Sequence, residues 1–367
     1  MNRRDLLLCS GGFAATMVIP EIGLSGELVE AEATRRGDVV QLRWPKQGLP
    51  VSVYVAVVAD APLAAMRRLV RDRRALDLQV SAHVRPRPYF LLTARDGSQT
   101  RVAERLLPLE GGRNFRDLGG YRTVDGTQVR WGRLFRSGYM SDLTTGDIDY
   151  LQALGIQVIC DLRSQQERAN APSSLLSARG LRVEASEYDF SRLMNGQRPF
   201  PGPAATVADF TDYLSDAYVA QAEQGLVEHL QRIFAHLLSG EAPLAFNCMG
   251  GKDRTGVVAA MILAVLGVPR ATVVADYGLT ARYLPRSEID RMMADGGRRL
   301  GVSPELAAAT ARMPIDVQEV LLGTDPTVMD SCLSKIEARH GSALELAKQR
   351  YGLDTAAISQ LRRLYTA

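Results

Sequence analysis

Short apolar runs dominate residues 35–107. VVQLRW, VSVYVAVV, LQVSAHV, YFLLTAR and QTRVAERLLPL each have the length of a β-strand, and their hydrophobic positions alternate or follow one another directly. Arg95-Asp96-Gly97-Ser98 separates the last two runs as a hairpin turn. Because several short strands occur here with turns between them and no long helix, we expect a small all-β sandwich domain over residues 35–107.

The pattern changes after a short linker near residues 108–112. Segments with helical periodicity now alternate with short apolar runs of strand length. Strands that alternate with helices are typical of an α/β domain, so we expect a central sheet flanked by helices over residues 108–367. The runs that we expect to form buried strands are residues 158–162, 182–188 and 244–246.

Residues 206–239 have helical periodicity and contain no strand-like run. They predict a helical insertion of two helices, broken near Gly225, ahead of the strand at residues 244–246. Two interpretations stay open, because a helical insertion can cover a reactive site as a lid or pack on the core with its apolar face.

Residues 1–33 have the features of a targeting segment. Arg3 and Arg4 precede an apolar stretch of about 15 residues, which is too short to span a bilayer as an ordinary helix. The order Arg-Arg-Asp-Leu-Leu resembles a twin-arginine export signal. We therefore expect a periplasmic or secreted protein without stable membrane insertion, the alternative being a frayed N-terminal helix of a cytoplasmic protein.

The composition of the chain bears on which classes of partner and cofactor we expect. The chain of 367 residues is 46% hydrophobic and 23% charged, which is ordinary for a globular protein with two domains. Its net charge of +3 is too small to indicate nucleic-acid binding. The four cysteines and four histidines have no metal-ligand spacing. We expect no metal and no cofactor.

Residues 243–267 carry the strongest chemical signal. A short apolar run precedes Cys248, five residues separate Cys248 from Arg254, and an apolar stretch of helical length follows. A strand, a glycine-containing loop and a helix in this order bring backbone N–H groups and a helix N-terminus together, and this arrangement binds phosphate. The alternative is a purely structural role, in which Cys248 is a small buried hydrophobic residue.

Each side chain of this loop has a candidate role. Cys248 is the candidate nucleophile, because a helix N-terminus and nearby cations stabilise a thiolate. Arg254 can hold two phosphate oxygens, and Asp253 can protonate the leaving oxygen. Lys252 adds a charge at the rim, and the Thr255 hydroxyl can hydrogen-bond the sulfur. We expect phosphate to contact Met249, Gly250, Gly251, Lys252, Arg254 and Thr255.

Two further carboxylates compete with Asp253 as the acid. Asp161 and Asp189 come at or just after the ends of predicted strands, and ligands bind beyond the carboxyl ends of strands in α/β sheets. Asp161 is therefore a second catalytic candidate, although a structural ion pair with Arg163 would explain it equally well.

NCMGGKDRTG resembles the phosphate-binding signature of cysteine-dependent tyrosine phosphatases. It is most similar to an atypical bacterial branch whose loop reads His-Cys-x-x-Gly-Lys-Asp-Arg-Thr-Gly. NFRDLGGY at residues 114–121, LFRSG at 134–138 and DLRSQQE at 161–167 also resemble that branch, in the expected order. One difference is Asn247, which stands where the branch has a histidine that helps to tune the thiolate.

The resemblance implies a function. It implies a phosphatase that acts on protein phosphotyrosine through a cysteinyl phosphate, with phosphoserine, phosphothreonine and phosphoinositides as further substrate classes. It also favours Asp253 as the acid, and it makes the helical insertion similar to the lid of a secreted relative. In the all-β domain, the placement of Trp44 and Tyr89 is similar to that in fibronectin type III domains.

Three other interpretations remain. Asn247 is compatible with a non-catalytic phosphate-binding module, and a loop cysteine is also compatible with a rhodanese-like sulfur transferase. Alternatively, the all-β domain defines the role by binding a partner that the sequence does not identify. Its arginine cluster suits an anionic partner or a solvated face, and comprises Arg67, Arg68, Arg71, Arg73 and Arg74.

Overall fold

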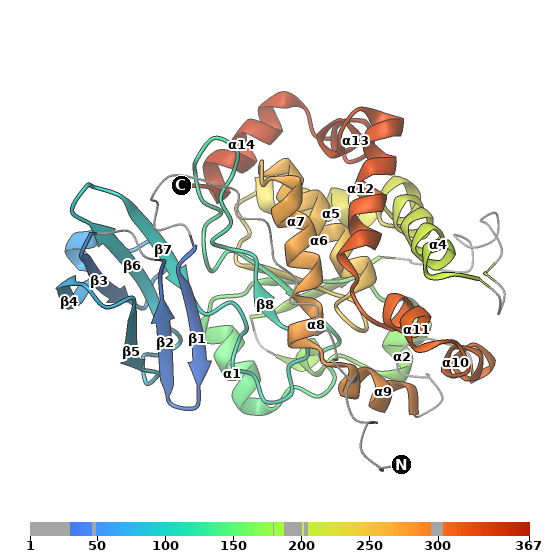
Figure 1. The fold of residues 1–367 in the computed structure, drawn as a ribbon, viewed down its shortest axis with the longest axis horizontal. Coiled ribbons are helices and arrows are strands. Elements are labelled where there is room, and N and C mark those ends of the chain that lie inside the picture. Colours follow the sequence, from blue (N-terminus) through green and yellow to red (C-terminus); the bar gives the residue numbers. More distant parts are fainter. Residues whose placement is uncertain (1–29, 46–48, 179, 187–199, 202–204, 295–303) are drawn as a thin grey trace, which may run out of the picture.

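The computed structural model describes residues 30–367 except for 46–48, 179, 187–199, 202–204 and 295–303. Residues 1–29 of the expected export signal lie outside the described residues, as does Asp189. Figure 1 shows an all-β unit beside a larger α/β unit in which helices surround a sheet. This confirms the predicted α/β fold preceded by an all-β region.

Two antiparallel sheets form the N-terminal unit. A three-stranded sheet has the order β1-β2-β5, and a four-stranded sheet has the order β4-β3-β6-β7. Their facing apolar side chains form one core that includes Leu42, Val53 and Phe90. The strands are β1 (Glu32–Arg36), β2 (Val39–Arg43), β3 (Val51–Ala56), β4 (Arg67–Arg73), β5 (Asp77–Ser81), β6 (Tyr89–Ala94) and β7 (Gln99–Ala103).

Two of these strands lie outside the predicted runs. β1 and β4 are rich in arginine and are the edge strands of their sheets. Edge strands tolerate charged side chains that face water, so they lack the apolar alternation of a half-buried strand. The arginine cluster of the sequence is therefore largely a β-strand.

The α/β unit has a five-stranded sheet with the order β11-β10-β12-β9-β8. β8 runs antiparallel to β9, and the other neighbouring strands are parallel. β12 lies at the centre and is buried along its whole length, as expected for a strand covered on both faces. The strands are β8 (Arg116–Asp117), β9 (Leu134–Ser137), β10 (Val158–Asp161), β11 (Arg182–Ala185) and β12 (Leu244–Asn247).

Alternate residues of the central strands face two separate cores. Leu244 packs in the larger core with α6 and the C-terminal helices, whereas its neighbour Ala245 packs in the smaller core with α1. Helix α6 is buried on nearly all sides, which explains its continuous apolar sequence. These helices are α1 (Thr145–Ala153), α6 (Asp253–Val265), α12 (Pro326–His340), α13 (Ala343–Arg350) and α14 (Thr355–Tyr365).

The helical insertion is present as two helices. α4 (Val207–Ala220) and α5 (Val227–Leu238) are joined by a π-helical turn at Gln221–Gly225. α4 packs against α11 and α12. The remaining helices are α2 (Gln165–Asn170), α7 (Arg270–Gly278), α8 (Thr280–Tyr283), α9 (Arg286–Ala294), α10 (Pro304–Ala311) and α11 (Ile315–Leu322).

A buried ion pair joins the all-β unit to the α/β unit. Nη1 of Arg87 lies 3.1 Å from Oδ2 of Asp117, and both side chains are fully buried. Asp117 also accepts hydrogen bonds from the backbone N–H groups of Gly119 and Gly132, both at 2.8 Å. Burial raises the pKa of Asp117 although Arg87 opposes it. The two units therefore share a polar contact that cannot reach water.

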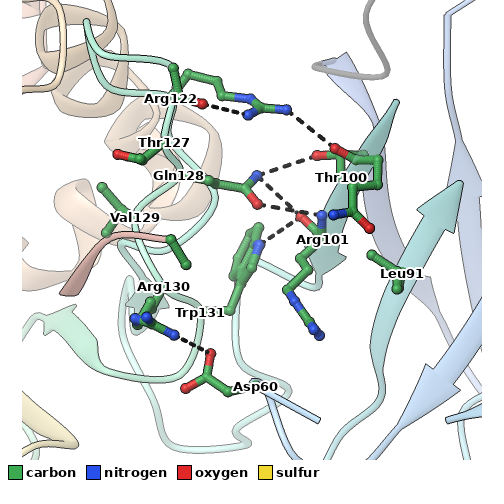
Figure 2. A pocket seen from close by; sticks show the side chains of 13 residues that line it. Asp60, Leu91, Thr100, Arg101, Arg122, Thr127, Gln128, Val129, Arg130 and Trp131 are labelled. Carbon is green, nitrogen blue, oxygen red and sulfur yellow. Dashed lines mark hydrogen bonds and ion pairs between the residues drawn. The ribbon is translucent and has the colours of Figure 1, made fainter. Parts of the chain in front are cut away.

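A cavity of about 440 Å³ lies between the same two units (Figure 2). Trp131 borders it and donates its indole N–H to the carbonyl oxygen of Arg101 at 2.9 Å. Nη1 of Arg130 lies 3.4 Å from Oδ1 of Asp60, so the lining contains an ion pair as well as apolar side chains. No helix among the described residues combines the length and the hydropathy needed to cross a membrane.

Candidate active site

The carboxyl ends of three parallel strands meet at one edge of the sheet. Asp161 of β10, Asn247 of β12 and Ser137 of β9 are register partners there. Cys248 follows Asn247 directly, and the loop that it begins ends at the first residue of α6, Asp253. The candidate nucleophile therefore lies beyond the carboxyl end of the central strand and ahead of a helix N-terminus, where an anion is stabilised.

Gly251 allows the loop to lie against the neighbouring strand. Its φ of +65° is in the left-handed region, and a Cβ atom there would lie 2.5 Å from the backbone nitrogen of Gly138. The backbone of Gly138 in turn lies close to the carbonyl of Met249. Only glycine fits at position 251 without displacing β9.

Residues of two motifs, NFRDLGGY and LFRSG, hydrogen-bond the carbonyl oxygens of the loop. Asn114 donates its amide N–H to the Gly251 carbonyl at 3.0 Å, and Arg136 donates to the same oxygen at 2.9 Å. The Met249 carbonyl accepts the N–H of Tyr139 at 2.8 Å. Asn114 itself has a φ of +55°, a conformation that asparagine tolerates better than most residues. The NFRDLGGY segment at residues 114–121 thus holds the loop directly through Asn114.

Positive charge exceeds negative charge beneath the loop. Arg116 and Arg136 are fully buried and share the carboxylate of Asp276, at 3.6 Å and 2.6 Å. Burial and the Arg136 charge lower the pKa of Arg116 to about 10, so it remains cationic at neutral pH. Burial opposes ionisation of Asp276, yet the two arginines lower its pKa to about 2. Two cations with one carboxylate favour an anion in the loop above them.

Cys248 is almost inaccessible and reduced. Its exposed fraction is 2%, and it is a free thiol, as are Cys160 and Cys332. Burial raises the pKa of each of the other two thiols to about 12. Among the described cysteines, Cys248 alone is in the loop that connects a strand to a helix N-terminus.

Arg254 is held in one plane by Glu167. Its Nη1 and Nη2 atoms each lie 2.6 Å from a different oxygen of the Glu167 carboxylate, and Nη1 also donates to the Leu162 carbonyl at 3.2 Å. Glu167 belongs to a capping box with Ser164 at the start of α2. Burial opposes its ionisation, but Arg254 and Ser164 lower the pKa of Glu167 below its usual value. The carboxylate is therefore charged and orients the guanidinium.

Asp253 has two side-chain partners. Nζ of Lys252 lies 2.9 Å from its Oδ1 atom, and the Tyr218 hydroxyl of α4 donates to the same oxygen. Burial opposes ionisation of the carboxyl, but Lys252 and Tyr218 lower the pKa of Asp253. The side chain is nevertheless 41% exposed, so the carboxyl is accessible from outside.

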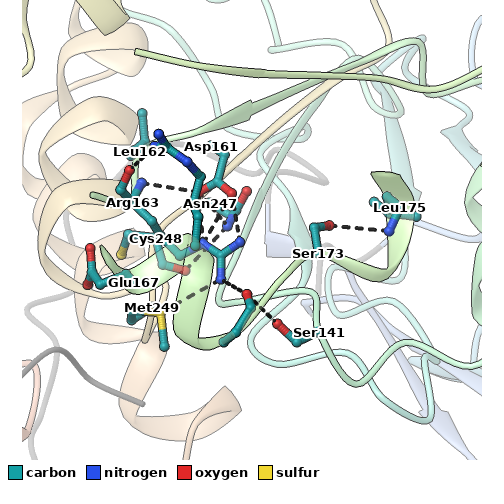
Figure 3. A network of polar contacts seen from close by, with 12 residues as sticks. Ser141, Asp161, Leu162, Arg163, Glu167, Ser173, Leu175, Asn247, Cys248 and Met249 are labelled. Carbon is teal, nitrogen blue, oxygen red and sulfur yellow. Dashed lines mark hydrogen bonds and ion pairs between the residues drawn. The ribbon is translucent and has the colours of Figure 1, made fainter. Parts of the chain in front are cut away.

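Asp161 is part of a buried network at the end of β10 (Figure 3). Arg163 donates to both of its carboxylate oxygens, at 2.7–3.1 Å, and Asn247 donates to Oδ1 at 3.4 Å. Arg163 also donates to the Ala171 carbonyl at 2.7 Å and lies 3.9 Å from the sulfur of Met249. Asn247 thus bridges Asp161 and the Cys248 carbonyl.

The structure brings most of the predicted site residues to this loop. The Thr255 hydroxyl contacts the Ser137 carbonyl at 3.5 Å, and Lys252 donates to the Leu321 carbonyl at 3.0 Å. Asp189 cannot be placed, because it lies outside the described residues. No group of three or more histidine, cysteine, aspartate or glutamate side chains in the described ranges is arranged to hold a metal ion.

Several residues at this site had no predicted role, among them Arg116 and Arg136 beneath the loop. Glu167 is the last residue of the quoted DLRSQQE motif, so the sequence contained a signal for it. Tyr218, Tyr277 and Asp276 lie on helices far along the chain from their partners, and no local pattern indicates those contacts.

Comparison with known proteins places most of the chain in one family model. The model described as the tyrosine phosphatase family matches residues 107–367. A Cupriavidus necator protein with a provisional tyrosine-protein phosphatase name is 28% identical over 257 residues, 69% of this chain and 86% of that protein. A triple specificity protein phosphatase of Mycobacterium tuberculosis, PtpB, is 29% identical over 287 residues, 71% of this chain and 98% of that protein.

Two further comparisons cover less. A tyrosine-protein phosphatase of Nostoc commune is 33% identical over 152 residues, 41% of this chain and 48% of that protein. Among solved structures, TpbA of P. aeruginosa is 17% identical, covering 51% of this chain and 91% of that one, with a TM-score of 0.23.

Proposed function

Because the chain belongs to the tyrosine phosphatase family, we propose that it hydrolyses phosphotyrosine in proteins through a cysteinyl phosphate on Cys248. The observation that carries the proposal is that Cys248 and Arg254, the latter in the first turn of α6, flank one loop between β12 and α6. Its carbonyls are tied back by Asn114 and Arg136, and Arg254 is oriented by Glu167. Such preorganised donors are the main source of transition-state stabilisation in phosphoryl transfer.

In the first step the Cys248 thiolate attacks phosphorus. The S–P bond forms, the P–O bond to the tyrosine side chain breaks, and Asp253 gives its proton to the departing phenolic oxygen. Asp253 is ionised in the free protein, but the charge of a bound phosphate monoester favours its protonated form. Arg254 and the loop N–H groups hold the other phosphoryl oxygens.

In the second step water hydrolyses the cysteinyl phosphate. The S–P bond breaks, a new P–O bond forms to the water oxygen, and the Asp253 carboxylate takes one proton from that water. Inorganic phosphate leaves, and the thiolate of Cys248 and the protonated Asp253 are regenerated. The same carboxyl therefore serves as acid and then as base.

The test is phosphate release from a phosphotyrosine peptide, with reductant and without added metal. We expect release by the wild type, none by Cys248→Ser, and an unchanged rate for Cys332→Ser. Cys332 is a matched control, since it is another buried free thiol whose pKa burial raises to about 12. Release by Cys248→Ser at the wild-type rate would contradict the mechanism.

Two additional assays on the wild-type protein, vanadate binding and sulfur transfer from thiosulfate, separate the alternative functions. Vanadate binding without phosphate release by the wild type would indicate a non-catalytic phosphate-binding module, the interpretation that Asn247 keeps open. Sulfur transfer from thiosulfate would indicate a rhodanese-like enzyme.

The substrate range forms a second part of the proposal. We propose that phosphoserine, phosphothreonine and phosphoinositides are also substrates, and the printed name of the M. tuberculosis relative, a triple specificity phosphatase, supports a broad range. Lys252 adds a positive charge beside Asp253 that suits a multiply charged head group, and its side chain is 10% exposed. Initial rates on the three peptide classes and on phosphoinositide vesicles would rank them, and activity on phosphotyrosine alone would refute this part.

Export and the identity of the all-β unit complete the proposal. Arg3 and Arg4 support twin-arginine export to the periplasm or beyond. The division into sheets of three and four strands supports a fibronectin III-like sandwich. Replacing both arginines by lysine should leave the protein in the cytoplasm of a bacterial host, and periplasmic recovery of that variant would contradict the export proposal.

A further inference from the structure

Tyr218 links the helical insertion to the proposed catalytic acid. It lies on α4, 35 residues before Asp253 in the sequence, and its hydroxyl donates to Oδ1 of Asp253. The Tyr218 oxygen is also 2.9 Å from the hydroxyl oxygen of Tyr277 on α7. Since the proton of Tyr218 is directed at the carboxylate, Tyr277 is the donor in that second hydrogen bond.

Burial keeps both phenols neutral. The rings of Tyr218 and Tyr277 pack edge to face with centroids 6.0 Å apart, and both side chains are fully buried. Burial and the Asp253 charge raise the pKa of Tyr218 well above its usual value. Tyr218 therefore keeps its proton at neutral pH and acts toward Asp253 only as a donor.

The two partners of Asp253 occupy the same oxygen. Tyr218 and Lys252 both contact Oδ1, whereas no residue in the part of the chain that the structure describes hydrogen-bonds Oδ2. Lys252 is itself held by the Leu321 carbonyl of α11. The charged and titratable groups around this carboxyl are Lys252, Arg254, Tyr218 and, behind it, Tyr277.

The helix that carries Tyr218 is anchored at its polar face. Nζ of Lys335 on α12 lies 2.7 Å from Oδ1 of Asp212 and 2.6 Å from Oδ1 of Asp216. It also donates to the Ser215 hydroxyl at 2.8 Å. These contacts lie within two turns before Tyr218 and hold the helix that carries the phenol against α12.

We propose that Tyr218 is a positioning residue that, with Lys252, holds Oδ1 of Asp253 and leaves Oδ2 to carry the proton to the leaving group. The inference rests on the proposed function, in which Asp253 is the acid. Oδ2–H protonates the phenolic oxygen as its bond to phosphorus breaks, and Oδ2 later takes a proton from water. Tyr218 neither gains nor loses a proton. The helical insertion thereby supplies part of the acid's geometry, in addition to covering the core.

The test compares Tyr218→Phe with wild type on two substrates that need the acid to different extents. Phosphotyrosine has a basic leaving group, whereas p-nitrophenolate leaves with little help from an acid. We expect kcat/KM to fall about tenfold for phosphotyrosine and less than about threefold for p-nitrophenyl phosphate, since general acids contribute 10²–10⁴-fold. A role in packing alone would lower both rates equally, and that result overturns the proposal.

The pH profile is a second readout. Removing a hydrogen bond from the carboxylate favours its protonated form, so the falling limb of kcat/KM moves to higher pH by about one pH unit in Tyr218→Phe. An unmoved limb overturns the proposal. Tyr365→Phe is the matched control, because it deletes another buried hydroxyl, one that donates to the Leu237 carbonyl near the end of α5.

Two further variants keep the outcome interpretable. Asp253→Asn abolishes the falling limb if Asp253 is the acid; if the limb persists, the Tyr218 proposal fails, while the Cys248→Ser result still decides the phosphatase function. If Tyr218→Phe does not fold, Tyr277→Phe takes its place, because Tyr277 contacts Tyr218 through its hydroxyl. It should move the limb in the same direction by less, and no movement overturns the proposal.

Discussion

The guanidinium of Arg254 and the carboxylate of Glu167 meet edge to edge, with two N–O distances of 2.6 Å. The arginine comes from the start of α6 and the glutamate from the first turn of α2. A bidentate pair of this kind fixes the plane of the guanidinium as well as its position. The residue that is proposed to hold phosphate is thus oriented by a side chain 87 positions earlier in the sequence.

Glu167→Gln should lower catalytic efficiency, because Gln replaces one charged contact with Arg254 by a donor that the guanidinium cannot use. We expect kcat/KM to fall about 10²-fold if the guanidinium moves by an ångström or so. Glu345→Gln is the control, since Glu345 pairs with Lys348 on the surface of α13. A rise in kcat/KM for Glu167→Gln would show instead that Glu167 competes with phosphate for Arg254.

Arg87→Met should destabilise the whole chain. It leaves the Asp117 carboxylate buried without its cation, and removing one partner of a buried ion pair costs about 3–5 kcal/mol. Urea unfolding measures the change, with the exposed Arg67→Met as the control. Deletion of residues 35–107 removes the same arginine, so the remaining α/β unit should unfold more readily. An unchanged unfolding midpoint for Arg87→Met would contradict this account of the contact between the units.

Asp276 should make stability depend on acid pH. Its pKa is about 2 in the folded protein against 3.8 in the unfolded chain. A depressed carboxyl pKa stabilises the folded state above the unfolded pKa, and this contribution, about 2 kcal/mol, is lost as pH falls from about 4 to 2. Asp276→Asn should be less stable at neutral pH and lack this part of the acid-induced loss. Parallel stability curves for the two proteins between pH 5 and 2 would refute it.

Asp161→Asn should affect stability more than chemistry. Arg163 and Asn247 occupy both oxygens of Asp161, unlike those of Asp253, so Asp161 has no oxygen left for a leaving group. We expect a loss of about 3–5 kcal/mol in unfolding free energy and a kcat/KM profile that keeps its falling limb. The catalytic role of Asp161 stays a prediction, and disappearance of that limb in Asp161→Asn would support it over Asp253.

Much of the site could be predicted because its centre is contiguous. Cys248 begins one loop and Asp253 and Arg254 begin the helix that follows it, and the strand before the loop and the helix after it follow from adjacent apolar runs. Glycine at position 251 meets a local backbone requirement, a φ of +65°. The all-β region was also predicted, apart from β1 and β4, which are arginine-rich edge strands and lack the alternation that indicates a strand.

The sequence by itself determined the α/β class, the all-β region before it, and the loop and helix start in which five residues separate a cysteine from an arginine. These depend on periodicity and on residues close together in the chain. Only the tertiary structure decided which side chains orient that loop. Glu167 reaches Arg254, Tyr218 reaches Asp253, and Arg136 and Asp276 lie beneath Gly251. Each contact joins separate elements, and buried polar groups find such partners only once the chain is packed and water is excluded.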